Sequence, residues 1–270
     1  MLLLQISDTH FGTERPEVVE ALVREADALA PDAVLLVGDI TQRARAAQFA
    51  AAAEVMARLP GKLHVAVPGN HDLPLFNLVA RLFWPYAGFE KSFGPRRTLW
   101  SGQGLTLLAL DATHPKRHKN GELPALMLRE RLAEARSSAG PDGLLVLAAH
   151  QPLWTAWQKD GHQTLLGRDQ TALILAEHRV DLVLSGHVHV PLIGLSTIGF
   201  KLPWTYVLSG TGTAVSDRTR AGAPNSFNLI EVTPGAQPRI ELSRYDYAAT
   251  GFGCAERRGF RRGETGWVEG

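Results

Sequence analysis

The sequence predicts an α/β fold in which the last part of the chain is richer in strands than in helices. Up to residue 185, short apolar runs alternate with segments of helical periodicity, as in a sheet whose strands are connected by helices. From about residue 189 onward, strand-like runs follow one another with little helical pattern, which indicates a mixed or antiparallel sheet beside the first. Five of the apolar runs end in residues that can bind a metal, and this links the fold to a function.

Five buried strands are predicted from apolar runs bounded by turn residues. They span residues 2–7, 33–37, 63–68, 143–149 and 180–185. The residues that follow them are Asp8-Thr9-His10, Gly38-Asp39, Gly69-Asn70-His71-Asp72, His150 and Gly186-His187-Val188-His189. In such sheets, ligands bind outside the carboxyl ends of the strands, so we expect these side chains to meet at one rim.

Helices are predicted in the connections. Residues 16–29 begin with a proline suited to a first helical turn, and residues 44–59 are rich in alanine. Two more helices are expected at 122–136 and 168–178, and residues 73–100 contain a short aromatic helix or lid. The remaining expected strands span residues 104–111, 205–210, 226–232 and 239–245.

Composition excludes several classes of protein. The 270 residues are 45% hydrophobic and 20% charged, which is typical of a globular chain with a full core. A net charge of +1 argues against a stable nucleic-acid partner, and the single cysteine, Cys254, excludes an intrachain disulfide and a cysteine-rich zinc site. Without a signal-peptide pattern or an apolar run of about 18 residues, we expect a cytoplasmic protein with no membrane association.

The donors at the strand ends suit a pair of metal ions. Asp8 and His10, like His187 and His189, are two residues apart, and such residues point to the same side of an extended chain. Carboxylate, imidazole and carboxamide donors without thiolate suit Mn, Fe, Zn or Co. Asp39 alone would be read as a turn residue and His150 alone as structural, but five of the ten histidines fall in these blocks.

The five blocks DTH (8–10), GD (38–39), GNHD (69–72), His150 and GHVH (186–189) resemble, in order, the calcineurin-like metallophosphoesterase superfamily. Residues 210–232 resemble the end of its bacterial cyclic-nucleotide and glycerophosphodiester phosphodiesterase-like branch. The resemblance implies a four-layer α/β/β/α sandwich of two mixed sheets with helices outside. We expect this domain to cover residues 1–250, followed by a Gly- and Arg-rich tail at 251–270 that is loose or docked.

The resemblance also implies the roles of the residues. Asp8, His10 and His189 would hold one ion, Asn70, His150 and His187 would hold the other, and Asp39 would bridge both as part of the catalytic machinery. His71 would face the scissile phosphate and give a hydrogen bond or a proton to the leaving group, while a metal-bound hydroxide attacks phosphorus. The expected cofactor is therefore two divalent or mixed-valence ions of Mn, Fe, Zn or Co.

The expected reaction is hydrolysis of a small phosphodiester, such as a cyclic nucleotide or a glycerophosphodiester. A phosphomonoesterase, a nuclease and a non-catalytic scaffold that has lost its metals are the alternatives. His114, Arg117 and His118 lie in a polar loop where relatives contact the substrate, and they are the candidate substrate ligands. His150 is followed by Gln151, where relatives often carry a second histidine. The aromatic segment 76–89 is a packed lid, a surface for a homo-oligomer or a hydrophobic substrate pocket.

Overall fold

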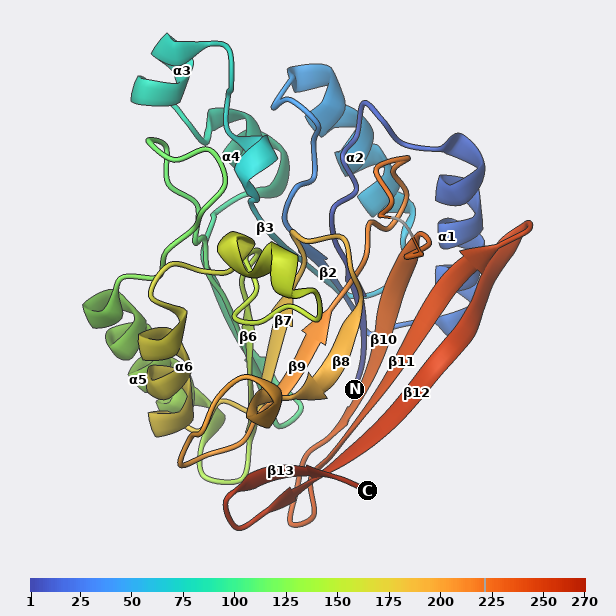
Figure 1. The fold of residues 1–270 in the computed structure, drawn as a ribbon. Coiled ribbons are helices and arrows are strands. Elements are labelled where there is room, and N and C mark those ends of the chain that lie inside the picture. The colour runs from blue at the N-terminus through green and yellow to red at the C-terminus, as the bar shows by residue number, and fades with distance from the viewer. Residues whose placement is uncertain (221) are drawn as a thin grey trace.

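Two mixed β-sheets lie face to face in the computed structural model, which describes residues 1–220 and 222–270 (Figure 1). The seven-stranded sheet has the order β13 (Gly266–Glu269), β12 (Gly251–Gly263), β11 (Arg239–Ala248), β10 (Ser226–Thr233), β1 (Leu2–Ile6), β2 (Ala33–Val37), β3 (Leu63–Val67). The six-stranded sheet has the order β4 (Thr98–Gly102), β5 (Leu105–Ala109), β6 (Leu144–Ala148), β7 (Leu182–Ser185), β9 (Val207–Gly210), β8 (Leu192–Leu195).

Helices cover the outer face of each sheet (Figure 1). The seven-stranded sheet is covered by α1 (Pro16–Leu29), α2 (Ala46–Arg58) and α4 (Ala87–Phe93), and their apolar residues share a core with that sheet. The six-stranded sheet is covered by α5 (Ala125–Ala139) and α6 (Arg168–Glu177) in the same way. A third core lies between the sheets, so the predicted four-layer α/β/β/α sandwich is confirmed.

The alternation of side chains along β2 explains why its sequence is apolar throughout. Leu35 and Val37 point into the core between the sheets, whereas Val34 and Leu36 point toward the helices. Side chains of a strand alternate between the two faces, and both faces of β2 are covered.

The carboxyl ends of two parallel blocks meet at one rim of the sandwich. In one sheet β1, β2 and β3 are parallel, and in the other β5, β6, β7 and β9 are parallel. The loops after β1 and β2 are joined by a hydrogen bond from Asp8 N to Gly38 O of 3.0 Å. The loop after β6 joins them through His150 Nδ1, which lies 2.9 Å from Val37 O. This rim carries the predicted metal ligands.

The C-terminal tail is docked rather than loose. Residues 251–270 form β12 and β13 at the far edge of the seven-stranded sheet. Trp267 is fully buried, and its Nε1 donates at 2.9 Å to Oδ1 of Asp181, the residue that precedes β7 of the six-stranded sheet. The tail therefore ties the two sheets together.

The aromatic segment divides into two parts. Tyr86 and Phe89 are buried, with Phe89 packed in the core under α2 and α4. Phe76, Phe83 and Trp84 are 79%, 64% and 64% exposed and lie on and around α3 (Leu78–Phe83), which projects from the molecule (Figure 1). Residues 73–100 therefore contain the expected short aromatic helix, α3, together with α4 and the start of β4. Within the described residues, none of the helices has the length and apolar character needed to cross a bilayer.

Candidate metal centre

Five strand ends bring the predicted ligands together at the rim. Asp8 and His10 follow β1, Asp39 follows β2, and His150 follows β6. His187 and His189 follow β7, and Asn70 lies in the short 3-10 helix after β3. The carboxylate and imidazole donors form two groups that share Asp39, one with Asp8, His10 and His189 and one with His150 and His187.

The two oxygens of Asp39 face different groups. Its Oδ2 lies 3.8 Å from His10 Nε2, whereas its Oδ1 lies 3.3 Å from His150 Nε2. On the first side, His189 Nε2 is 3.0 Å from His10 Nε2 and 3.2 Å from Asp8 Oδ1. On the second side, His187 Nδ1 is 3.3 Å from His150 Nε2. A carboxylate placed in this way can bridge two ions, as in sites that cleave phosphate esters.

Two buried polar atoms at the centre have no hydrogen-bond partner among the described residues, Asn70 Oδ1 and His187 Nε2. Buried polar atoms are nearly always paired, because leaving one unpaired costs free energy. Asn70 and His187 line one cavity of about 340 Å³ together with Asp39 and His189. An oxygen and a ring nitrogen left free in this cavity fit the ligand atoms of a metal ion.

Outer contacts fix the orientation of two histidines. His150 Nδ1 lies 2.9 Å from Val37 O, and His189 Nδ1 lies 2.7 Å from Arg218 O. Since a carbonyl only accepts, each Nδ1 carries the proton, and this leaves Nε2 free to bind a metal. The nitrogen and oxygen donors together fit two ions of the Mn, Fe, Zn or Co class.

Burial and neighbouring charges set the protonation states of the ligands. Burial lowers the pKa of His10 and of His187 to about 3, so both rings are neutral. Burial acts to raise the pKa of Asp39, but the neighbouring His150 and His71 outweigh it and hold this pKa well below its usual range. Burial likewise acts to lower the pKa of His150, yet Asp39 reverses the shift and raises it to about 9. A metal that binds at neutral pH would therefore displace a proton from His150.

The backbone is strained at the ligands. Asp8, His10, Asp39, His187 and His189 all have φ between 44° and 73°, in the left-handed region. They are half of the ten non-glycine residues with positive φ in the described chain. Each such residue costs about 1–3 kcal/mol, and strain of this kind persists at functional sites because the surrounding structure holds it.

The glycines of the motifs allow this close packing of loops. A Cβ on Gly186 would collide with Ser7 Oγ and lie 2.8 Å from Ser7 Cβ, and a Cβ on Gly69 would lie 2.8 Å from Asp39 Cα. A side chain at either position would separate two ligand-bearing loops. The sequence contains these glycines, but it does not show the close contacts that require them.

Gly186→Ala is expected to destabilise the protein by about 1–3 kcal/mol, because the added methyl group overpacks the junction of the loops after β1 and β7. The free energy of unfolding, from denaturant titration followed by circular dichroism, measures the effect. Gly251→Ala is the matched control, since its Cβ would meet no atom within 4 Å. Equal stability of Gly186→Ala and the wild type would contradict the close contact between Gly186 and Ser7.

Asp72, the last residue of the GNHD block, is a structural carboxylate. Its Oδ2 accepts from Gly69 N at 2.8 Å and from Ile40 N at 3.1 Å, and its Oδ1 accepts from Thr41 N at 2.8 Å. Burial and the nearby Asp39 raise the pKa of Asp72 to about 7. These bonds hold the loops after β2 and β3 together beside the ligands.

His71 lies next to the ligands without belonging to either group. Its backbone N donates to Asp39 Oδ1 at 2.8 Å, and its ring centroid is 4.8 Å from that of His10. The ring's Nδ1 lies 3.1 Å from Gln42 O, and its Nε2 lies 3.3 Å from Arg218 Nη1. This position, at the edge of the cavity, suits a residue that contacts substrate, and that role stays a prediction.

The three predicted substrate ligands differ in their position relative to the cavities. His118 lines a second cavity beside the metal centre, whereas His114 is exposed and its Nδ1 accepts from Lys116 N. Arg117 forms an ion pair with Glu122, with Nη1 2.5 Å from Oε2, and does not line either cavity.

One arginine at the centre of the site was not among the residues predicted from the sequence. Arg218 Nη1 lies 3.0 Å from Gln42 Oε1, 3.2 Å from His10 Nδ1 and 3.3 Å from His71 Nε2. It follows β9, which is parallel to β7, so its strand also ends at the rim. The place of its strand in the sheet is the signal that could have found it. The other cavity residues that the sequence did not single out are Lys119, Gln163, Thr219 and Arg220.

Comparisons with solved structures agree with this fold. A dimetal phosphatase from Danio rerio has a similar structure, with a TM-score of 0.65 and 13% identity over 96% of this chain and 98% of that one. A purple acid phosphatase from yellow lupin gives a TM-score of 0.62 and 12% identity, covering 97% of this chain and 53% of that one. Vacuolar Protein Sorting 29 from Cryptosporidium parvum gives 0.51 and 17%, covering 97% and 98%. At these identities the likeness shows the fold.

A sequence search of curated proteins finds no match. The family model described as calcineurin-like phosphoesterase matches residues 1–191, which contain all five predicted motif blocks. This match covers most of the chain and agrees with the resemblance seen in the motifs. The chain therefore belongs to the calcineurin-like phosphoesterase family.

Proposed function

We propose that this protein hydrolyses small phosphodiesters with the help of two metal ions bound at the rim. The single observation that carries the proposal is Asp39, whose two carboxylate oxygens face two separate groups of ligands. Asp8, His10 and His189 would hold one ion, and Asn70, His150 and His187 the other. Bound there, the ions would neutralise phosphate charge and lower the pKa of water.

Arg218 and His71 are the groups that would handle the substrate. The Arg218 guanidinium borders the cavity and forms no ion pair with a carboxylate in the described part of the chain, so it is available to a phosphate oxygen. An arginine and a phosphate form strong, charge-assisted hydrogen bonds. His71 Nε2 lies 3.3 Å from the same guanidinium, so a phosphate held by Arg218 would be next to the imidazole.

His71 is held in one orientation by its contact with the Gln42 carbonyl at 3.1 Å. In the imidazolium form, Nδ1–H donates to that carbonyl and Nε2–H faces the cavity. The ring can then give its proton to the oxygen of the leaving group, which is the usual task of a general acid. The side chain of the adjacent Asn70 would bind the metal, so the two neighbouring residues would have different roles.

Bis(p-nitrophenyl) phosphate is expected to be turned over with a higher kcat/KM than p-nitrophenyl phosphate. The preference is motivated by the likeness of residues 210–232 to a diesterase branch, and this segment supplies Arg218 and Arg220 to the cavity. The measurement is release of p-nitrophenolate by the protein loaded in turn with Mn, Fe, Zn and Co. A higher kcat/KM for the monoester with several of these metals would identify a phosphomonoesterase instead.

A further inference from the structure

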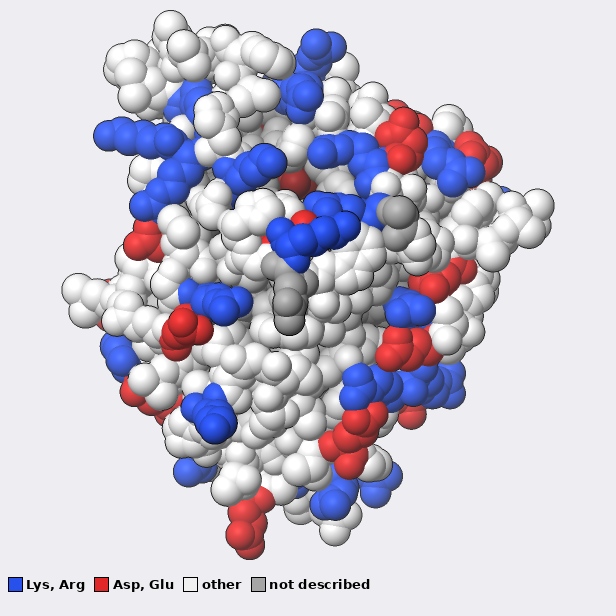
Figure 2. Space-filling model, viewed as in Figure 1, with Lys and Arg blue, Asp and Glu red and all other residues white. Residues whose placement is uncertain are grey.

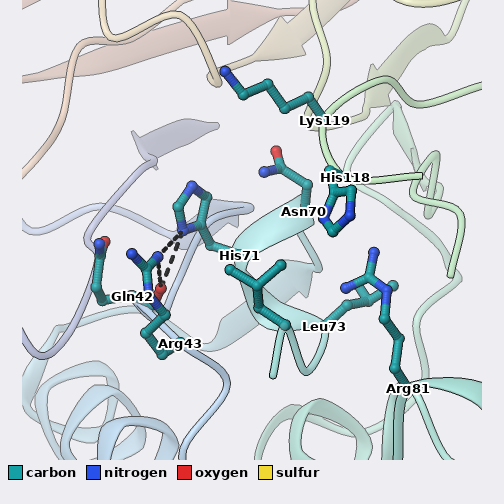
Figure 3. Close-up of a pocket in the computed structure, with 9 residues that line it drawn as sticks. Gln42, Arg43, Asn70, His71, Leu73, Arg81, His118 and Lys119 are labelled. Atoms are coloured by element: carbon teal, nitrogen blue, oxygen red, sulfur yellow. Dashed lines mark hydrogen bonds between the residues drawn. The ribbon is translucent and has the colours of Figure 1, made fainter. Parts of the chain in front are cut away.

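A second cavity adjoins the metal centre. It has a volume of about 220 Å³ and is lined by Gln42, Arg43, Asn70, His71, Leu73, Leu75, Arg81, His118 and Lys119 (Figure 3). We call it the outer cavity. It shares Asn70, His71 and Lys119 with the cavity that holds the metal ligands, so the two cavities lie side by side.

The outer cavity is lined by positive charge. Its lining contains Arg43, Arg81 and Lys119 but no aspartate or glutamate. Among the described residues, none of these three side chains forms an ion pair with a carboxylate. Figure 2 shows lysine and arginine side chains around a hollow in the same end of the molecule, although the net charge of the whole chain is only +1. Such a concentration of cations around a cavity attracts anionic ligands.

Arg81 is fixed as a permanent part of this wall. It is only 7% exposed, and its guanidinium donates to the carbonyls of Pro74, Pro115 and Arg117 at 2.6 to 2.9 Å. These neutral acceptors hold the side chain without neutralising its charge. Arg43 is held similarly, with Nη1 donating to Gln42 O at 2.9 Å. Lys119 is exposed and reaches into both cavities.

His71 lies on the boundary between the two cavities, and its position indicates which part of a substrate the outer cavity would bind. His71 Nε2 lies 3.3 Å from Arg218 Nη1 and its Nδ1 lies 3.4 Å from Arg43 Nη1, so the ring would stand between Arg43 and a phosphorus atom held beside Arg218. If His71 Nε2 protonates the leaving oxygen, the rest of that alcohol can extend past His71 into the outer cavity, because His71 lines both cavities. The outer cavity is therefore the place of the alcohol that leaves, and not of the group that remains on phosphorus.

We propose that the outer cavity binds a second anionic group on the leaving alcohol, and that a phosphate, with its two negative charges, fits it best. This inference rests on the proposed function. The substrate would then be a phosphodiester in which one alcohol itself carries a phosphate. Water supplies the oxygen of the new bond to phosphorus. The bond to the leaving oxygen breaks with its electron pair, and that oxygen takes a proton.

Three methyl aryl phosphodiesters test the proposal. Their leaving groups are 2-nitrophenols that carry, in position 4, a phosphonomethyl group, a carboxylate or the methyl ester of that carboxylate. The phosphonate stands in for a phosphate that cannot be hydrolysed. Each kcat/KM is divided by the rate constant of the same diester's uncatalysed hydrolysis, because the three nitrophenols differ as leaving groups. We expect this corrected kcat/KM to fall in the order phosphonate, carboxylate, methyl ester, with about a tenfold difference between the carboxylate and its ester, the usual scale of a charge-assisted contact. Raising the ionic strength should reduce the difference through screening.

Lys119→Gln assigns the effect to the outer cavity. It should lower the ratio of kcat/KM for the carboxylate and ester substrates by about two- to fivefold, because one of the three cations is lost and this one is exposed. Lys116→Gln, an exposed lysine of the same loop that lines neither cavity, is the matched control and should keep the wild-type ratio. Calorimetry gives a readout without turnover. The free carboxylated nitrophenol should bind the wild type more tightly than its methyl ester does, and Lys119→Gln should reduce this preference.

The outcomes separate this inference from the proposed function. Hydrolysis of all three diesters with equal corrected kcat/KM would support the function and overturn the anionic subsite. An unchanged ratio and unchanged binding preference in Lys119→Gln would also overturn it, because the discrimination would then arise elsewhere. If none of the diesters is hydrolysed by the metal-loaded protein, the proposed function fails and the inference fails with it.

Discussion

Asp39→Ala is expected to lose both metal ions, whereas the wild type should hold two per chain. The reason is geometric: Asp39 is the one residue common to the two ligand groups of the described chain, with one oxygen toward each. Metal content per chain, measured by elemental analysis after reconstitution with Mn or Zn and removal of free metal, checks this result. Activity on any phosphate ester should be lost with the metals.

His10→Ala and Asp142→Ala complete the experiment. His10 lies in only one of the groups, so its loss should weaken mainly one ion and leave a content near one per chain. Asp142 is an exposed carboxylate outside both groups, and its alanine variant should keep two ions. A wild type that binds at most one ion would exclude a dinuclear centre. Equal loss of both ions in His10→Ala would show that the division of the ligands between two ions is wrong.

His71→Ala is expected to keep near-normal metal content and to lose about 10²–10⁴-fold in kcat, the usual contribution of a general acid. The ring lies beside the ligands but outside both groups, so its removal should spare the ions. The loss should be smaller for a p-nitrophenyl diester than for an alkyl diester, because p-nitrophenolate leaves without a proton. The measurement is kcat for both substrates together with metal content.

His64→Ala is the control for this variant, since His64 is an exposed histidine of β3 and lines neither of the two cavities at the site. It should match the wild type in metal content and activity. Loss of a metal ion in His71→Ala would make His71 a ligand. An equal loss of activity with both leaving groups would mean that His71 holds the phosphate and gives no proton.

The central strands and main helices were predictable because tertiary contacts agree with local pattern there. The helix expected at 16–29 is α1 with the same bounds, and the run at 33–37 is β2 with both faces covered. The strands toward the edges of the sheets were harder to predict. In β12, glycine and arginine hide the strand pattern, and only Phe260 is fully buried among its thirteen residues. An edge strand needs few apolar residues, so its sequence carries little signal.

The ligands were predictable because each one follows a strand that can be recognised from its run of apolar residues. Arg218 also follows a predicted strand, but it lies eight residues beyond Gly210, and contacts between distant parts of the chain fix its loop. Ser216 Oγ contacts Thr13 Oγ1 at 2.7 Å, and Ser216 O accepts from Asn225 Nδ2 at 2.7 Å. The left-handed backbone of Asp8 and His10 was equally hidden. Aspartate and histidine adopt it more often than most residues, but still only in a minority of cases.

The position of β1 in its sheet has a consequence for how the protein is made. This first strand lies between β2, which follows it closely, and β10, which begins only at Ser226. On the ribosome, one edge of the strand LLLQI therefore stays unpaired until residues 226–233 have emerged. An unpaired apolar edge is prone to pair with other chains. We expect nascent chains that stop before residue 226 to aggregate or to depend on chaperones, and refolding to be slowed by this distant pairing.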